Sequence, residues 1–259
     1  MWNLTRRIGR RSVLALPMAF SATRLLADEV VPNLQKADGV EPVLDQLRTK
    51  VVVLKIRRPS GATASGTGFV VAPGVVLTAG HVVPEDVEVT AWLNGVGYRA
   101  DLVRKHPDLD VAVLRLSAPS LELKPVTLAG MRSALSPGEP LMIVTGPSQA
   151  SGARGEPESR EAVALNFKER RRLTADRPSS EVLVLTGQVR LGDSGSPVVR
   201  VMEGTVIGLL SSREVPDASG QSHFAYVVPA ESFAVWLRET LTAPDREEFY
   251  LKKLVAKPT

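Results

Sequence analysis

The sequence predicts an all-β protein, a sandwich or barrel arrangement, with one α-helix near its C-terminal end. Short runs rich in Val, Ile, Leu and Thr follow one another between residues 51 and 228, and turn signals separate them at intervals of about 8–12 residues. Only one segment has convincing helical spacing of apolar residues, and no repeat of roughly 20–50 residues is visible. The 259 residues suffice for a substantial core in one large or two small domains.

The strands of the first half are expected within residues 51–117, after an N-terminal segment, 28–50, that is compatible with a short helix at 42–49. Pro73-Gly74 and Asn94-Gly95 are the turn signals between neighbouring strands, the second suited to a tight hairpin. Val87, Val89, Ala91 and Leu93 alternate with polar residues and are predicted to share one face. The expected strands are 51–56, 68–71, 75–79, 86–93, 98–103 and 111–116.

The second half repeats this pattern after a connector, residues 118–137, that is rich in Pro, Ser and Leu. Its strands are expected within residues 138–229, at 140–145, 162–166, 181–186, 197–201, 205–211 and 224–228. Gly, Ser, Pro and charged residues crowd residues 146–160, which are predicted to be a mobile surface loop. A helix follows at 230–242, before a tail of undetermined role, 243–259; its predicted buried stripe is Phe233, Trp236, Leu237, Thr240 and Leu241.

Residues 1–27 have the order of an export signal. A basic stretch, 1–12, precedes a short apolar stretch, 13–22, and cleavage is expected after Ala27, although Arg24 interrupts the cleavage region. The apolar stretch is too short to cross a bilayer, so no stable membrane insertion is expected once the leader is removed. Residues 9–14 resemble the twin-arginine signal; an ordinary export signal and organelle targeting are the alternatives. The protein is therefore expected to be periplasmic or secreted.

Charge and composition exclude several classes of function. The formal net charge is +4, but the leader holds five arginines and no acid, which leaves 27 basic against 28 acidic residues. The remaining chain gives no electrostatic case for nucleic-acid binding, and the basic run 168–172 is interpreted as a solvated loop or strand end, with a substrate- or surface-binding role as the alternative. With no Cys, three His and no HExxH motif, neither a Cys-based nor a His-rich metal site is expected. The functional hypothesis given below needs no metal or organic cofactor.

Three segments carry a chemical pattern: Thr78-Ala79-Gly80-His81, then Leu109-Asp110-Val111-Ala112-Val113-Leu114, then Gly192-Asp193-Ser194-Gly195-Ser196-Pro197. They resemble the signature segments of trypsin-like (chymotrypsin-fold) serine peptidases. Ser65-Gly66-Thr67-Gly68-Phe69-Val70-Val71 is similar to the strand before the histidine in bacterial members, including the high-temperature-requirement proteases. The resemblance covers about residues 51–241 and implies two antiparallel six-stranded β-barrels with the site between them. The tail is too short for the C-terminal peptide-binding module of some bacterial relatives.

The resemblance assigns the nucleophile to Ser194, the general base to His81 and the orienting acid to Asp110. A serine hydroxyl is a weak nucleophile that needs a base, an imidazole titrates near neutral pH, and a carboxylate fixes the imidazole tautomer. The backbone N–H groups of Gly192 and Ser194 are expected to form the oxyanion hole, since Gly192 permits the sharp turn that aims them.

Other residues compete for these roles. Asp108 and Asp101 are alternatives to Asp110, which is favoured because an apolar strand begins directly after it. His106 lies in a polar stretch and is interpreted as a solvated surface residue. His223 adjoins the last strand, where a structural role is favoured over a place near the specificity pocket.

The substrate pocket is expected, by alignment with the third motif, to contain Gln188, Ser211, Ser212 and Arg213, with residues 224–226 in its wall. No acid stands at its base, which counts against a preference for Lys or Arg. Arg213 is interpreted as pointing to solvent, with a preference for acidic substrates as the alternative. The sequence does not identify the partner of Asp193, because no Ile-Val-Gly-Gly-like start precedes residue 51; constitutive activity, or control by another rearrangement, is favoured over activation by trimming.

The functional hypothesis is a serine endopeptidase that cleaves proteins or peptides through an acyl-enzyme on Ser194. Two alternatives remain open at this stage: a non-catalytic binding or chaperone protein with a protease fold, and an esterase-type acyl hydrolase. The sequence does not determine the oligomeric state.

Overall fold

The computed structural model describes residues 38–117, 123–130, 135–147, 156–214 and 224–242. The expected export signal, the tail and His223 lie outside these ranges. No helix within the described ranges is long and apolar enough to span a membrane.

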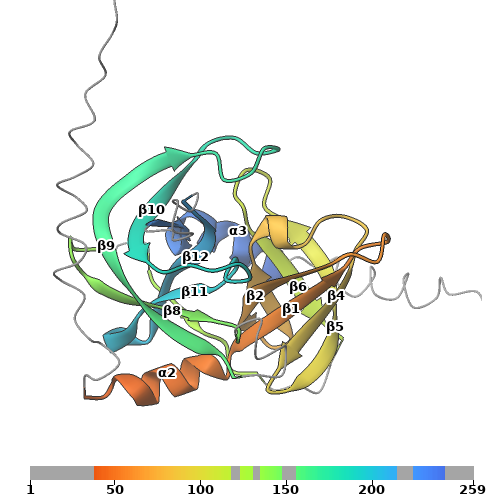
Figure 1. The fold of residues 1–259 in the computed structure, drawn as a ribbon, viewed down its shortest axis with the longest axis horizontal. Helices are drawn as coiled ribbons and strands as arrows, with labels where there is room; N and C mark the ends of the chain where they lie inside the picture. The colour runs from red at the N-terminus through yellow and green to blue at the C-terminus, as the bar shows by residue number, and fades with distance from the viewer. Residues whose placement is uncertain (1–37, 118–122, 131–134, 148–155, 215–223, 243–259) are drawn as a thin grey trace, which may run out of the picture. The chain divides into compact units, whose positions relative to one another are not determined.

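The first six strands close into an antiparallel barrel in the order β1-β2-β3-β6-β5-β4 (Figure 1). Pairing of β1 with β4 closes the barrel. The hairpin at Asn94-Gly95 is confirmed, with both residues at positive φ (48° and 77°), as a tight turn requires. Val89, Ala91 and Leu93 are buried as expected, and Val87 is half-buried. The strands are β1 (Val51–Arg57), β2 (Thr63–Ala72), β3 (Val75–Thr78), β4 (Glu88–Leu93), β5 (Val96–Lys105) and β6 (Ala112–Leu116).

A second antiparallel barrel has the order β11-β8-β9-β10-β13-β12 and is closed by pairing of β11 with β12. A short strand, β7 (Thr127–Leu128), adds to β12 in parallel. The prediction of two six-stranded antiparallel barrels is therefore confirmed. The six strands are β8 (Pro140–Thr145), β9 (Glu158–Arg171), β10 (Ser180–Gly187), β11 (Pro197–Arg200), β12 (Thr205–Arg213) and β13 (Phe224–Pro229).

The long strand β9 corrects part of the sequence analysis. Residues 158–160, assigned to a surface loop, are its first residues and pair with β8, while 148–155 lie outside the described ranges. The basic run 168–172 forms the end of β9 up to Arg171, in agreement with the strand-end interpretation. Lys168 forms ion pairs with Glu181 (2.7 Å) and Glu231 (2.8 Å), and Arg171 stacks 3.8 Å over the Tyr226 ring. Charged side chains with partners on neighbouring elements are compatible with a strand, which local polarity alone does not reveal.

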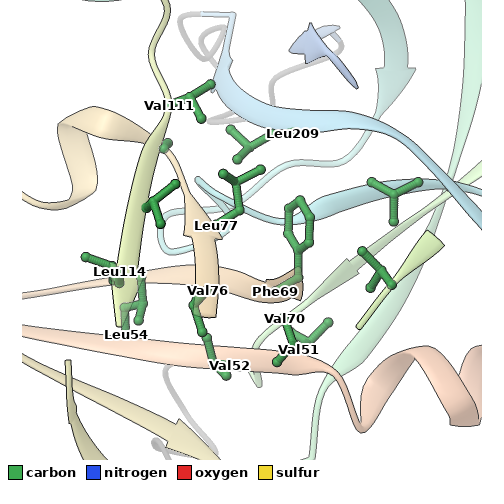
Figure 2. Packing of buried hydrophobic residues seen from close by; sticks show 14 of the residues in the cluster. Val51, Val52, Leu54, Phe69, Val70, Val76, Leu77, Val111, Leu114 and Leu209 are labelled. Atoms are coloured by element: carbon green, nitrogen blue, oxygen red, sulfur yellow. The ribbon is translucent and has the colours of Figure 1, made fainter. Parts of the chain in front are cut away.

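Buried aliphatic residues fill both barrels. Around Phe69 in the first barrel, Leu54, Leu77 and Leu114 pack tightly, and Leu209 from the second barrel joins the same cluster (Figure 2). A separate cluster fills the second barrel; its largest members are Leu141, Ile143, Leu185 and Leu210. Because the first cluster crosses between the barrels, apolar packing contributes to holding the two together.

Two helices flank the barrels. The N-terminal helix α2 (Val40–Arg48) begins two residues before the expected segment, and it buries Val40, Leu44 and Leu47. The C-terminal helix α3 (Ala230–Thr242) confirms the expected helix, since four of the five predicted stripe residues are buried and Leu241 is half-buried. Near α3 the ring of Trp236 also contacts the first barrel, through His106.

Candidate active site

The strand pairing of the first barrel brings His81 and Asp110 together. Antiparallel β3 and β6 pair Thr78 with Ala112, so the end of one strand lies beside the start of the other. His81 follows β3 in a short 3-10 turn, Gly80–Val82, and Asp110 lies two residues before β6. Residues 29 positions apart therefore leave the sheet at one end. This placement depends on strand register rather than on local sequence.

The carboxylate of Asp110 holds His81 through both oxygens. Its Oδ1 accepts from the His81 backbone N–H (2.8 Å), and its Oδ2 lies 2.7 Å from His81 Nδ1. The hydroxyl of Ser211 also donates to Oδ2. Burial raises the pKa of Asp110, but the hydrogen bonds and charge of His81 and the bond from Ser211 outweigh it and hold that pKa below its ordinary value. An ionised carboxylate only accepts, so the Nδ1 of His81 carries the ring proton and the lone pair is on Nε2.

The competing acids lie elsewhere. Asp101 pairs with Arg99 (3.1 Å), and the exposed Asp108 contacts His106 through its backbone N–H. The Asp110 side chain is fully buried, whereas that of His81 is 38% exposed. A buried acid beneath an accessible imidazole is the arrangement that a general base requires.

Ser194 is connected to the His81–Asp110 pair through Ser211. The Ser194 hydroxyl donates to the Ser211 carbonyl (3.2 Å), while the Ser211 hydroxyl donates to Asp110. Within the described residues no hydrogen bond joins His81 to Ser194; such bonds often tighten only once substrate is bound. Ser211 was assigned to the pocket wall, but its buried side chain faces the acid.

The loop that carries Ser194 depends on two glycines for different reasons. A Cβ on Gly195 (φ 91°) would lie 1.9 Å from the Thr67 carbonyl oxygen, so the close approach excludes a side chain. A Cβ on Gly192 (φ 98°) would meet nothing within 4 Å, so only the backbone conformation favours glycine there. The Gly192 carbonyl accepts from the Thr67 hydroxyl (2.8 Å). The backbone N–H groups of Gly192 and Ser194 have no partner among the described residues. These two donors are free to bind an anionic oxygen.

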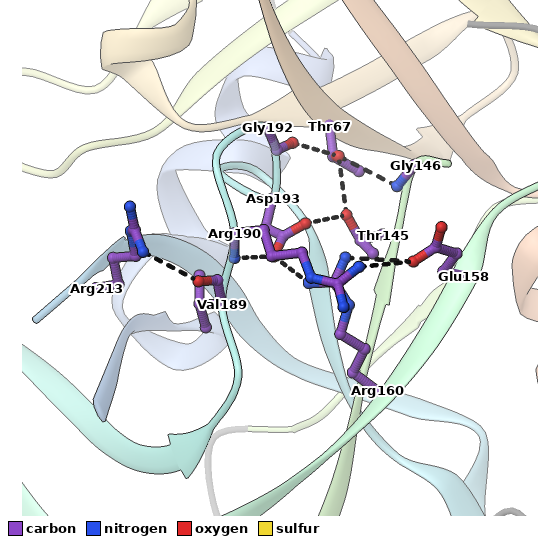
Figure 3. A network of polar contacts seen from close by, with 10 residues as sticks. All are labelled: Thr67, Thr145, Gly146, Glu158, Arg160, Val189, Arg190, Gly192, Asp193 and Arg213. Atoms are coloured by element: carbon purple, nitrogen blue, oxygen red, sulfur yellow. Dashed lines mark hydrogen bonds and ion pairs between the residues drawn. The ribbon is translucent and has the colours of Figure 1, made fainter. Parts of the chain in front are cut away.

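A buried network fixes Asp193, the residue between these donors (Figure 3). Its Oδ1 accepts from the Thr145 hydroxyl (2.8 Å), and its Oδ2 accepts from the Arg190 backbone N–H (2.6 Å) and from the guanidinium of Arg160. The side chains of Arg160 and Asp193 are 12% and 4% exposed, so water screens the pair little. The partner missing from the sequence analysis is therefore Arg160. It went unnoticed because it was assigned to a loop.

The remaining predicted pocket residues surround the same loop. Gln188 is exposed just after β10, Ser212 is half-buried, and Arg213 donates to the Val189 carbonyl (3.3 Å), across the start of the loop. Beside Gly192, Leu191 is 74% exposed, an apolar surface that the sequence analysis did not identify.

The interpretation of His106 was wrong. His106 is not a solvated surface residue: its ring lies 5.0 Å from that of Trp236, and its Nδ1 accepts two backbone N–H groups. The neighbouring apolar helix face, distant in sequence, supplies that contact, so the local polar sequence was misleading.

Two closed antiparallel barrels, with a His–Asp pair and a Gly-Asp-Ser-Gly loop linked through Ser211, define a chymotrypsin-fold protein. The chain belongs to the trypsin-like peptidase family, because residues 66–209, more than half of its length, match the trypsin-like peptidase domain. Serine protease Rv3671c of Mycobacterium tuberculosis is 27% identical over 182 residues, which are 68% of this chain and 43% of that protein. The match thus spans less than half of that relative's length.

Solved structures share the fold. The active form of the Rv3671c protease from M. tuberculosis superposes with a TM-score of 0.65 at 22% identity, covering 92% of this chain and 94% of that one. The HtrA-type protease AlgW with a decapeptide gives 0.62 at 16% identity, covering 79% and 68%.

Proposed function

We propose that this chain is a serine endopeptidase that cleaves proteins or peptides through an acyl-enzyme on Ser194. The observation that carries the proposal is the link from His81 through Asp110 and Ser211 to Ser194, beside two N–H donors that have no partner among the described residues. Membership of a peptidase family and relatives named serine proteases support it.

The geometry suggests the following chemistry. The Ser194 oxygen attacks the scissile carbonyl carbon while His81 Nε2 takes the hydroxyl proton, and Asp110 stabilises the resulting imidazolium. The Gly192 and Ser194 N–H groups donate to the carbonyl oxygen as it becomes negative. His81 then gives its proton to the leaving amine as the peptide C–N bond breaks. Water then attacks the acyl carbon while His81 takes its proton. His81 returns this proton to the Ser194 oxygen as the acyl C–O bond breaks, which releases the carboxylic acid and restores the Ser194 hydroxyl.

Arg160 supports the oxyanion donors through Asp193. In Arg160→Met, the buried Asp193 carboxylate loses its cationic partner, a change that typically costs about 3–5 kcal/mol of unfolding free energy. We also expect kcat for peptide cleavage to fall by about 10²–10³-fold, as when an oxyanion donor is lost. Denaturant unfolding and steady-state kinetics measure the two effects.

Arg190→Met is the matched control. The Arg190 side chain is 57% exposed and, like Arg160, pairs with Glu158, but it meets Asp193 only through the backbone. Arg190→Met should leave the unfolding free energy and kcat nearly unchanged. Adding Asp193→Asn to Arg160→Met removes the unpaired charge and should restore part of the stability. Equal effects of the two arginine variants would contradict the assigned role of Arg160.

Peptide-library profiling of the purified protein tests the proposed function. Cleavage within peptides, absent in Ser194→Ala, is the expected result. Hydrolysis of activated esters without peptide cleavage would instead favour an acyl hydrolase, and neither activity in a folded chain would favour a binding protein. We also propose that Gln188 and Ser212 line the pocket. A preference for acidic side chains in the same profile would favour a pocket role for Arg213, and no such preference would favour the solvent-facing alternative.

We also propose that residues 1–27 direct export, and that the chain functions in the periplasm or outside the cell. The basic and apolar order of the leader supports this proposal. We further propose that the chain divides into an N-terminal segment, two barrels joined by a connector, a helix and a tail, at residues 28–50, 51–117, 118–137 (the connector), 138–229, 230–242 and 243–259.

A further inference from the structure

We infer that His106, in its neutral form, is a positioning residue for Asp110 that ties the loop before this acid to the second half of the protein. This inference rests on the proposed function, because it concerns how the acid of that site is held. His106 lies at the end of β5, four residues before Asp110.

The His106 ring organises the backbone that carries Asp110. Its Nδ1 accepts the N–H groups of Asp108 (3.1 Å) and Leu109 (3.0 Å). The His106 backbone N–H donates to the Val111 carbonyl (2.9 Å), and the Val111 N–H donates to the Leu109 carbonyl (2.8 Å). The turn around Asp110 is thus closed by backbone bonds on one side and by one ring nitrogen on the other. An acceptor nitrogen must hold a lone pair, so Nδ1 is unprotonated in this arrangement.

Two elements from the second half of the chain fix this turn. Trp236 of α3 packs against the His106 ring, with centroids 5.0 Å apart. Arg177, between β9 and β10, donates to the carbonyls of His106 and Leu109, the second at 2.6 Å. The Arg177 side chain is only 10% exposed. The turn that carries Asp110 is therefore held by contacts from both barrels and from the C-terminal helix. His106 takes part in the contacts with Trp236 and with Arg177.

Protonation of His106 would undo this arrangement. A hydrogen on Nδ1 would face two N–H donors, and the imidazolium would stand near two arginines. Burial lowers the pKa of His106; Asp108 opposes this, and the charges of Arg177 and Arg104 add to the lowering. These groups come from the turn itself, from the β9–β10 connection and from β5, while α3 contributes the uncharged Trp236. At neutral pH the ring is accordingly neutral and able to accept both bonds.

Two substitutions distinguish the role of the acceptor nitrogen of His106 from that of the packing of its ring. His106→Asn keeps an oxygen near the position of Nδ1 that cannot be protonated, whereas His106→Phe keeps a ring against Trp236 and removes the acceptor. At about pH 8 we expect His106→Asn to retain most of kcat/KM, because its amide oxygen can accept both backbone N–H groups. His106→Phe should lose about 10–100-fold, mainly in kcat, since small displacements of a catalytic group cost about that much.

The acid side of the pH profile of kcat/KM distinguishes a positioning role from a merely structural one, because a structural role would leave its slope unchanged. In the wild type, protonation of His106 adds to whatever else lowers activity in acid, so log kcat/KM should fall more steeply with decreasing pH at the acid end than in His106→Asn. His106→Asn should reduce this slope by up to one unit per pH unit. An unchanged slope in His106→Asn, together with full activity in His106→Phe, would overturn the inference.

Stability gives an independent check. Because the pKa of His106 is lower in the folded state than the ordinary 6.5, the unfolded chain binds the additional proton first. Unfolding free energy should therefore decline as pH falls below about 6.5 and level off below the folded-state pKa. His106→Asn should remove this decline. If His106→Phe does not fold, His106→Asn still decides the matter, and a wild-type chain inert to peptides and to a fluorophosphonate would signal failure of the proposed function instead.

Discussion

Replacing Ser194 with alanine is expected to lower kcat/KM for peptide cleavage by about 10⁶-fold, the effect of removing the nucleophile from such a site. The substitution deletes one hydroxyl, whose contact is a 3.2 Å hydrogen bond to the Ser211 carbonyl. A single neutral hydrogen bond contributes about 0.5–1.5 kcal/mol to stability, so the fold should persist. Peptide hydrolysis by the purified variant, with its circular dichroism spectrum, measures both effects.

A second serine in the same loop provides the control. Ser196 is fully buried, and its hydroxyl has no hydrogen-bond partner among the described residues. Ser196→Ala removes the same atom two positions away without touching Asp110 or the expected oxyanion donors, and it should keep most of the activity. If Ser194→Ala retained wild-type cleavage, another residue would be the nucleophile.

Asp110→Asn is expected to lower kcat by about 10⁴-fold while leaving substrate binding largely intact. Asp110 accepts three bonds, from the His81 backbone, the His81 ring and the Ser211 hydroxyl. A carboxamide has one acceptor oxygen, so its NH₂ group must face a donor or force the imidazole into the other tautomer. In that tautomer Nε2 carries the proton and cannot take one from Ser194. Steady-state kinetics at saturating peptide measures the loss.

The exposed neighbour Asp108 is the matched control for this substitution. Its side chain does not contact His81, so Asp108→Asn should leave kcat at neutral pH almost unchanged. A large loss in Asp108→Asn with none in Asp110→Asn would reassign the acid.

The unfolding free energy at low pH should also depend on Asp110. Its folded-state pKa lies below the ordinary value of 3.8, so the carboxylate stabilises the fold above that pH. This contribution is lost as pH falls through the folded-state pKa, and Asp110→Asn should remove it at every pH. Less dependence of the unfolding free energy on acid pH in the variant is the expected result.

Local patterns in the sequence were sufficient for the three motifs and for most of the strands, although not for the full length of β9 or for β7. Alternating apolar residues and turn dipeptides specify β-strands by themselves, and the order of the motifs indicated which His, Asp and Ser to compare. The contacts that hold these residues were not predictable in the same way. Arg160 meets Asp193 across 33 positions, and Ser211 meets Asp110 across 101. Such contacts depend on strand register and on the meeting of two barrels.

His106 also shows that local sequence does not predict tertiary contacts, because here it indicated exposure where the fold provides contacts. Its sequence neighbours are charged or proline, which indicated exposure. In the fold its environment is made by Trp236 and Arg177, the latter 71 positions away. Residue type predicts burial only on average, and a half-buried polar turn is where tertiary contacts override it.

The central claim is that Ser194 is activated as a nucleophile by His81. Mass-spectrometric mapping of the adduct formed when the folded protein reacts with a fluorophosphonate tests it most directly. We expect one adduct per chain, on Ser194, absent in Ser194→Ala, unchanged in Ser196→Ala and formed far more slowly in Asp110→Asn. An adduct on another residue, or none in a folded chain that still cleaves peptides, would contradict the claim.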